Sequence, residues 1–335
     1  MTEHTALEPA GIGPLIADEG LPVPSSSAPG AKRKRDFDSV IAELRESRDI
    51  THNIRHGGVA RRLPSRAAVS EIVNGITVAL FPTHYGRPDL AFASIDQFVR
   101  RKLKTTLSQL EEQIGLSLPL AMSGEAPALA AARRIAQDIA EEFALRLPEI
   151  RAALVADLRA AHENDPGMAS MPEILLGHPG MVAIICYRIA RSLYLLGVPL
   201  IARLITLIAH SKTGIDIHPG AEIGDKFSID HGTGIVIGET AIIGSSVRLC
   251  QNVTLGANRN PAGQGIPASR GAARHPVIED NVFIFAGATL LGRITIGKGS
   301  VIGGNVWLTR SVPPRSNITQ SQSSSLFTGS AIGPT

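Results

Sequence analysis

The chain has 335 residues and a formal net charge of +3, so it is long enough for two structural units. Although its pI is about 9.0, so small a net charge argues against the broad basic face of a nucleic-acid-binding protein. Cys186 and Cys250 lie far apart in apolar patterns, which favours buried, reduced thiols in a cytoplasmic protein over a disulfide or a catalytic thiol. No apolar signal-peptide region is present near residue 1.

Residues 1–35 include the Pro/Ser/Gly-rich stretch GLPVPSSSAPGAKRKR and have too little apolar surface to offset the entropy of ordering. We expect a disordered leader there, with the basic cluster 32–35 solvated. Apolar residues in 36–210 follow helical spacing, which predicts an all-α domain without a cofactor site. Because a proline ring suits a first helical turn, we expect a helix to begin at Pro148. The apolar stretch 181–209 is interrupted by arginines, which favours packed helices over a membrane span.

Residues 211–313 repeat with a period of six. Apolar residues recur at one position and again two residues later, in the series Ile217, Ile223, Ile229, Ile235, Ala241, Val247 and Val253, and the series Ile237, Ile243, Leu249 and Leu255. This self-similarity predicts a hexapeptide-repeat solenoid, in which three hexapeptides form a coil and residues eighteen apart stack. At the glycines that follow these residues, we expect backbone angles unfavourable for a side chain; they are Gly238, Gly244 and Gly256.

Two segments depart from the repeat. Residues 257–276, ANRNPAGQGIPASRGAARHP, form a polar Gly/Pro-rich insertion, and insertions of this kind are typically functional or disordered. Residues 314–335 are expected to form a flexible C-terminal tail, since the six-residue pattern is lost.

Ionisable residues gather around the predicted solenoid, among them Asp216, His218, Asp230, His231 and His275. Asp216 and His231 are fifteen residues apart, three short of a coil, so we expect them within reach on adjacent coils. A carboxylate that accepts a proton from one imidazole nitrogen leaves the other nitrogen free as a base. Two other interpretations stay open: polar residues that only face solvent, and histidines that hold zinc. Since no histidine follows His275, we expect no metal site of the γ-class carbonic anhydrase kind.

Several segments together resemble the serine O-acetyltransferases: DIHPGAEIG, DHGTGIVIGETAIIG, VTLGA, RHPVIEDNVFIFAGATLLG, and NDPG followed by ILLGHPGMVAIICYRIARSLY. The resemblance covers roughly residues 160–312. It implies a left-handed parallel β-helix, an exception to right-handed crossovers, assembled as a homotrimer or a dimer of trimers with active sites between neighbours. The implied reaction is transfer of acetyl from acetyl-CoA, a co-substrate rather than a bound cofactor, to the hydroxyl of L-serine in cysteine biosynthesis. L-cysteine is the implied feedback inhibitor.

The resemblance also implies roles for individual residues. His231 matches the general base and Asp216 the carboxylate that orients it. Asp165 and Asp230 match residues that bind the serine amino group. Arg274 and His275 match residues that contact the serine carboxylate, since cationic and donor groups suit an anion.

Three further positions fall where the backbone of this family approaches CoA: Ala257, Ala286 and Gly287. The insertion is longer than the glycine-rich loop of enterobacterial members, and the chain ends in threonine rather than isoleucine. We therefore expect the usual C-terminal docking to O-acetylserine sulfhydrylase not to form. An O-acetyltransferase acting on a sugar or another hydroxyl compound is the alternative enzyme, although it would not need paired aspartates opposite an Arg-His pair. A non-catalytic assembly subunit is the other alternative.

Overall fold

The computed structural model describes residues 37–51, 55–56, 59–60, 62–89, 92–121, 129–165, 167, 170–258 and 272–320. The predicted leader, most of the insertion and the end of the predicted tail lie outside these residues. The chain divides into two compact units, Met1–Arg61 and Arg62–Thr335. In the first unit, the described residues form α1 (Phe37–Thr51) and the antiparallel strands β1 (Arg55–His56) and β2 (Val59–Ala60).

The second unit begins with helices, as the apolar spacing predicts. They are α2 (Arg66–Leu80), the π-helix η1 (Pro82–Gly86), α3 (Phe92–Ala121), α4 (Leu129–Asn164), α5 (Met171–Gly177), α6 (Pro179–Leu195) and α7 (Pro199–Thr213). Ser65 and Ser170 cap α2 and α5, because their hydroxyl oxygens accept hydrogen bonds from backbone N–H groups of the first turn. Gly214, with φ +71°, ends α7 in the left-handed conformation and turns the chain into the solenoid.

Pro148 lies inside α4 and does not begin a helix, so that prediction was wrong. An internal proline removes a backbone hydrogen bond and costs about 3 kcal/mol. On either side of it, Phe143, Leu147, Ile150 and Leu154 are buried. Because α4 packs against α3 and α6 along this stripe, apolar burial offsets the local cost and keeps the helix continuous.

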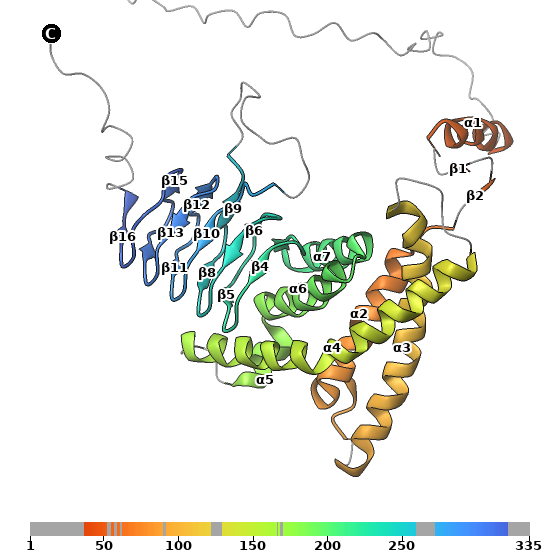
Figure 1. Ribbon diagram of the computed structural model, residues 1–335, viewed down its shortest axis with the longest axis horizontal. Helices are drawn as coiled ribbons and strands as arrows, with labels where there is room; N and C mark the ends of the chain where they lie inside the picture. Colours follow the sequence, from red (N-terminus) through yellow and green to blue (C-terminus); the bar gives the residue numbers. More distant parts are fainter. Residues whose placement is uncertain are drawn as a thin grey trace, which may run out of the picture. The chain divides into compact units, whose positions relative to one another are not determined.

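No single helix among the described residues is both long and apolar enough to cross a membrane, while α5 and α6 together meet that test with a bend of 71° between them. The apolar stretch 181–209 forms α6 and α7, which pack against each other and against the first solenoid coil (Figure 1). The prediction of packed helices there is confirmed.

A parallel β-solenoid follows the helices, as predicted (Figure 1). Its left-handed winding and the exact domain boundaries stay predictions. Three parallel sheets form its faces, with strand orders β13-β10-β7-β4, β16-β14-β11-β8-β5 and β15-β12-β9-β6-β3. The strands are β3 (Asp216–Ile217), β4 (Glu222–Ile223), β5 (Ser228–Asp230), β6 (Val236–Ile237), β7 (Ile242–Ile243), β8 (Arg248–Cys250), β9 (Thr254–Gly256), β10 (Val277–Ile278), β11 (Phe283–Ile284), β12 (Thr289–Leu291), β13 (Thr295–Ile296), β14 (Val301–Ile302), β15 (Trp307–Leu308) and β16 (Asn317–Ile318). β16 pairs with β14, so pairing continues past residue 313.

The first coil is two residues longer than the repeat predicts. Val236 pairs with Thr254, eighteen residues further on, as the hexapeptide period requires. Asp216, however, pairs with Val236, twenty residues further on. The expectation of an eighteen-residue spacing was therefore wrong for this coil. The additional residues lie in the corner between β5 and β6, directly after Asp230.

The sequence hides this insertion because each hexapeptide buries two side chains that are two residues apart. Ile215 and Ile217 are both buried, and so are Ile235 and Ile237. A two-residue insertion moves one apolar series onto the other, so apolar residues still recur every six positions. Ile235 stacks on Ile215 rather than continuing the series of Ile217, and counting the period does not reveal the change.

The predicted corner glycines serve close approach rather than unusual backbone angles. Gly238, Gly244 and Gly256 do not have left-handed φ values, so the expectation for their backbone was wrong. A Cβ atom on Gly238 would overlap the ring of His275, and one on Gly244 would lie 2.6 Å from Oδ1 of Asp280. These positions are small because side chains from the next coil rest on them.

A buried ion pair fastens the helices to the first coil. Asp157 on α4 is fully buried, and its two oxygens each lie 3.0 Å from a nitrogen of Arg188 on α6. The Phe227 N–H donates to the same carboxylate at 2.9 Å. Arg188 also donates to the carbonyls of Ile223 and Gly224. This ion pair therefore joins α4, α6 and two segments of the first coil, which fixes the helices that border the site.

Candidate active site

A cavity of about 450 Å³ opens where the helices meet the first coils of the solenoid. Three residues that the sequence predicts for the site line it: Asp165 after α4, Asp230 at the end of β5, and His231 in the corner that follows. The other lining residues were not predicted; they are Glu173, Gly177, His178, Pro179 and Arg248. The structure thus brings the candidate base and two candidate amine-binding carboxylates into one cavity.

His231 lies in the corner that the two-residue insertion enlarges. Its backbone has φ +57°, and Gly232 and Gly234 in the same corner also have positive φ. Other residues at solenoid corners, such as Ser246 with φ +59° and Asn281 with φ +56°, share this left-handed conformation, so it belongs to the corner geometry. The side chain of His231 is exposed. The enlarged corner therefore presents an imidazole outward instead of packing it into the coil.

Two of the carboxylates that line the cavity, Asp165 and Asp230, each have one oxygen engaged by the protein. Oδ1 of Asp165 accepts the Gly167 N–H at 3.0 Å. Oδ2 of Asp230 accepts from Nε of Arg248 at 2.6 Å, and Nη2 of the same guanidinium is 2.5 Å away. Within the described residues, no hydrogen bond reaches Oδ2 of Asp165 or Oδ1 of Asp230. Two open acceptors in one cavity suit a group with several N–H donors, such as an ammonium.

His178 is a second imidazole in this cavity that sequence reasoning missed. It precedes α6 as the N-cap residue. Burial lowers the pKa of His178, although Asp230 and Asp165 nearby oppose the shift. The ring is therefore favoured in its neutral form and adds no positive charge beside Asp165 and Asp230.

Asp216 is near the predicted base in topology but is not joined to it. Asp216 begins β3, which pairs with β6, and the corner of His231 leads into β6. In the part of the chain that the structure describes, no hydrogen bond or ion pair connects Asp216 with His231. Oδ1 of Asp216 is 3.6 Å from Nη1 of Arg203 and is buried without a hydrogen-bond partner. Buried acceptors are nearly always hydrogen-bonded, so this oxygen would be stabilised by a nearby donor that can rotate toward it.

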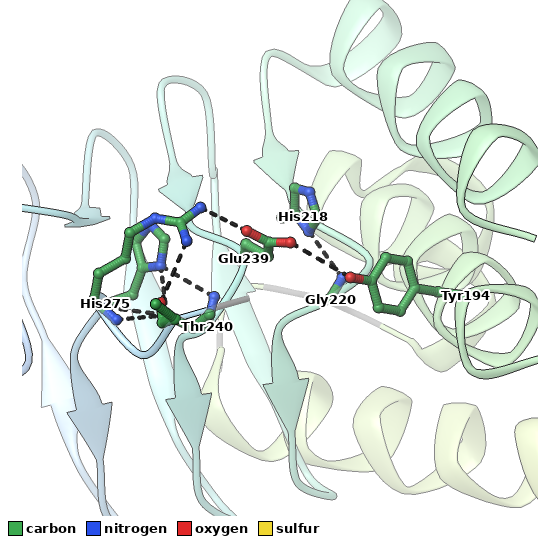
Figure 2. Close-up of polar contacts among 8 residues, drawn as sticks. Tyr194, His218, Gly220, Glu239, Thr240 and His275 are labelled. Atoms are coloured by element: carbon green, nitrogen blue, oxygen red, sulfur yellow. Dashed lines mark hydrogen bonds and ion pairs between the residues drawn. The ribbon is translucent and has the colours of Figure 1, made fainter. Parts of the chain in front are cut away.

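The predicted carboxylate-binding pair belongs to a second group of polar residues (Figure 2). Nη2 of Arg274 lies 2.5 Å from Oε2 of Glu239, and the Tyr194 hydroxyl donates to the other oxygen of Glu239 at 3.4 Å. Figure 2 shows Glu239 between His275 and Tyr194, with His218 beside it. The Thr240 hydroxyl accepts the Arg274 N–H at 2.9 Å. These contacts fix the C-terminal end of the insertion on the corner after β6.

The same arrangement fixes the tautomers of two histidines. Nδ1 of His275 accepts the Thr240 N–H at 3.0 Å, and Nδ1 of His218 accepts the Gly220 N–H at 2.9 Å. In each neutral ring the proton is therefore on Nε2, which becomes a donor. Burial, and then the nearby charges of Arg274 and Arg203 respectively, lower the pKa of each to about 4. The bond from Gly220 also holds His218 within its own turn.

These shifts predict that the protein loses stability as the pH falls from about 6.5 to about 4. The unfolded chain binds protons at His275 and His218 near pH 6.5, whereas the folded chain does so only near pH 4. Their contribution to stability is complete above pH 6.5 and decreases as the unfolded state gains protons first. Thermal melts between pH 7.5 and 4.5 should show a shallower fall in Tm for the variant His218→Gln with His275→Gln. Equal falls for that variant and the wild type would contradict the assignment.

The two groups do not meet within one chain. Among the described residues, no hydrogen bond or ion pair links Arg274 or His275 with Asp165, Asp230 or His231. Asp230 and His231 of the first group lie at the corner after β5, whereas Glu239 and Thr240 of the second lie at the corner after β6. The described residues also contain no group of three or more His, Cys, Asp and Glu placed to hold a metal ion.

The predicted CoA-contacting positions lie on the solenoid where coils stack. Gly287 has φ +75°, and its N–H donates to the Gln251 carbonyl at 3.0 Å. The carbonyl of Ala286 accepts the Asn305 N–H at 2.9 Å. Ala257 follows β9 and is half-buried. The Gly287 N–H and the Ala286 carbonyl are already bonded to neighbouring coils. These positions can therefore help a ligand mainly by being small, which lets it lie close to the backbone.

Comparison with known proteins agrees with this architecture. The sequence model of the family described as "Bacterial transferase hexapeptide (six repeats)" matches residues 275–310. In solved structures, serine acetyltransferase 1 of Entamoeba histolytica in complex with L-cysteine is 30% identical, with a TM-score of 0.64, over 84% of this chain and 97% of that one. Serine acetyltransferase isoform 3 of the same organism, in complex with cysteine, is 30% identical with a TM-score of 0.61, over 83% and 91% of the two chains.

Sequence relatives extend the comparison beyond the solenoid. The serine acetyltransferase of Bacillus subtilis is 42% identical over 165 residues, which are 49% of this chain and 72% of the relative. A plasmid serine acetyltransferase of Synechococcus elongatus is 47% identical over 305 residues, which are 89% of this chain and 95% of the relative. The chain therefore belongs to the serine acetyltransferase family, whose members are acyltransferases that use acetyl-CoA.

Proposed function

We propose that the chain transfers acetyl from acetyl-CoA to the L-serine hydroxyl with His231 as the general base. The observation that carries this proposal is the cavity that joins His231 with the open oxygens of Asp165 and Asp230. An imidazole nitrogen removes the hydroxyl proton as the serine oxygen attacks the thioester carbonyl carbon. The C–S bond then breaks, and the imidazolium returns the proton to the CoA thiolate. The products are O-acetyl-L-serine and CoA.

The two polar groups suit the two ends of serine. Asp165 and Asp230 receive the ammonium, whereas Arg274 and the Nε2–H of His275 receive the carboxylate. Because the groups are not in contact within one chain, we propose that a neighbouring copy supplies the carboxylate end. The active enzyme is then a homotrimer, or a dimer of trimers, with each site between two chains.

Asp216 is proposed to orient His231. Its buried Oδ1 lacks a hydrogen-bond partner, and a ring N–H of His231 can satisfy it while the other nitrogen faces the substrate. Three small residues are proposed to border the acetyl-CoA: Ala257, Ala286 and Gly287. Because their side chains are small or absent, the co-substrate can lie close to the backbone. Acetyl-CoA is a co-substrate here and leaves as CoA.

L-cysteine is proposed to bind the same cavity as a feedback inhibitor. It carries the same ammonium and carboxylate as serine, and the two similar Entamoeba histolytica structures hold cysteine. A cytoplasmic location is proposed because Cys186 and Cys250 are both free and buried.

Release of CoA thiol tests the function directly. The full chain is incubated with acetyl-CoA and L-serine, L-homoserine or simple sugars as the acceptor. We expect CoA release with L-serine well above the rate without acceptor, and inhibition by L-cysteine that added L-serine relieves. A sugar that supports release where L-serine does not would favour the alternative O-acetyltransferase.

A further inference from the structure

Arg248 lies in the cavity, and the proposed mechanism gives it no role. Both of its nitrogens that face Asp230 approach the same atom: Nε is 2.6 Å and Nη2 is 2.5 Å from Oδ2. Oδ1 of Asp230 is left without a hydrogen bond among the described residues. Because the guanidinium holds Oδ2, the orientation of the whole carboxylate is fixed, and so is the direction in which Oδ1 points.

Arg248 is itself held from the opposite side. Phe283 is its partner in the next strand, and the guanidinium carbon lies 4.8 Å from the centre of the Phe283 ring. Phe285 lies beside that ring, with centroids 4.2 Å apart. A planar guanidinium stacks well on an aromatic face. Arg248 is thus fixed between an aromatic platform and Asp230, and both charged side chains are mostly buried, at 27% and 18% exposure.

Charge explains why a cation is useful at this position. Asp165, Glu173 and Asp230 all line the cavity, and a cation is attracted to a site that carries three carboxylates. Arg248 offsets one charge without occupying Oδ1, so an ammonium can reach Asp230 while the ion pair stays intact. A direct contact between Arg248 and the substrate carboxylate is disfavoured, because the Nε and Nη2 fork is already used.

We propose that Arg248 is a positioning residue that holds Asp230 with Oδ1 directed at the substrate ammonium. This inference rests on the proposed function, in which Asp230 binds the amino group of serine. Arg248 then acts on recognition of the amine rather than on proton transfer. Its removal should weaken the binding of acceptors with an amino group and leave those without one unaffected.

The test uses Arg248→Ala and Arg248→Lys with three acceptors: L-serine, 3-hydroxypropanoate, which lacks the amino group, and L-serinamide, which lacks the carboxylate. For Arg248→Ala we expect KM for L-serine to rise about tenfold or more, equivalent to about 1.4 kcal/mol, with kcat and KM for acetyl-CoA nearly unchanged. The preference for L-serine over 3-hydroxypropanoate, measured by kcat/KM, should fall by about the same factor. Arg248→Lys should lie between, since one ammonium does not reproduce the planar fork.

Lys298→Ala is the matched control, because Lys298 forms an exposed ion pair with Asp280 on the same solenoid; it should leave all constants unchanged. Equal losses with L-serine and 3-hydroxypropanoate in Arg248→Ala would show a merely structural role. A selective loss of preference over L-serinamide would place Arg248 on the carboxylate. Either result overturns the proposal.

A further variant covers the case in which Arg248→Ala does not fold. Phe283→Leu keeps the ion pair but removes the platform, and it should raise KM for L-serine in the same direction by less; unchanged KM in both Phe283→Leu and Arg248→Lys overturns the proposal. If the wild type releases no CoA with L-serine, the proposed function fails and the role of Arg248 fails with it. If the wild type is active and Arg248→Ala keeps its KM, only the role of Arg248 fails.

Discussion

Replacing His231 should lower kcat by about 10²- to 10⁴-fold, the usual contribution of a positioned general base. Because His231 has φ +57°, alanine there adds backbone strain, whereas asparagine tolerates the left-handed region. His231→Asn is therefore the main test, because it removes the imidazole with less backbone strain. His231→Ala is a second variant that should show the same loss. Steady-state rates of CoA release at saturating L-serine measure the effect, and KM for acetyl-CoA should change little.

Ser246→Ala is the matched control for backbone strain, because Ser246 has φ +59° at another exposed corner of the solenoid. It should keep the wild-type kcat. A His231→Asn enzyme that retains more than about a tenth of the wild-type kcat would remove His231 from the role of base. Activity that is lost in both His231→Asn and Ser246→Ala would trace the loss to the corners and not to the imidazole.

Asp157→Ala should destabilise the second unit by about 3–5 kcal/mol, the cost of breaking a buried ion pair from one side. The substitution leaves Arg188 charged and 11% exposed, and it removes the acceptor of the Phe227 N–H. Most proteins have only about 5–15 kcal/mol of stability, so a large share is lost. Urea unfolding followed by circular dichroism measures the change.

Two further variants separate charge from packing. Glu112→Ala, which removes an exposed ion pair with Arg62, should cost less than about 1 kcal/mol. The double variant Asp157→Leu with Arg188→Met should recover part of the stability, because it leaves no unpaired charge. If Asp157→Ala unfolds at the same urea concentration as Glu112→Ala, the ion pair does not fasten the helices to the coil.

The sequence was sufficient for the type of fold and for three of the residues that line the cavity. Periodicity separates the helices from the solenoid, and the DHGT segment places Asp230 and His231 together. Asp165 could be assigned only through the resemblance, since the end of α4 brings it to the cavity across 65 residues of chain. Such long-range packing has no signature in local spacing.

Arg248 could not be predicted for a different reason. Outward positions of a solenoid are polar by default, so a single arginine carries no signal. An eighteen-residue spacing would put Arg248 beside Asp230, but spacing alone does not distinguish an ion pair from two polar side chains that both face solvent. In the structure Arg248 pairs with Ser228 and Asp230 with Cys250, so the guanidinium reaches Asp230 diagonally.

The two-residue insertion before β6 has a consequence for how a repeat protein acquires a unique site. In a regular solenoid, translation relates one coil to the next, so equivalent corners have the same backbone geometry. A histidine placed at any one of them would have the same surroundings as at the others. Lengthening the corner between β5 and β6 breaks that translational symmetry in the first coil, in addition to the longer insertion at 257–276. We expect that deleting His231 and Gly232 would yield a more regular stack of coils and an enzyme without its general base. In this scaffold the irregular corner, and not the repeat, therefore carries the catalytic residue.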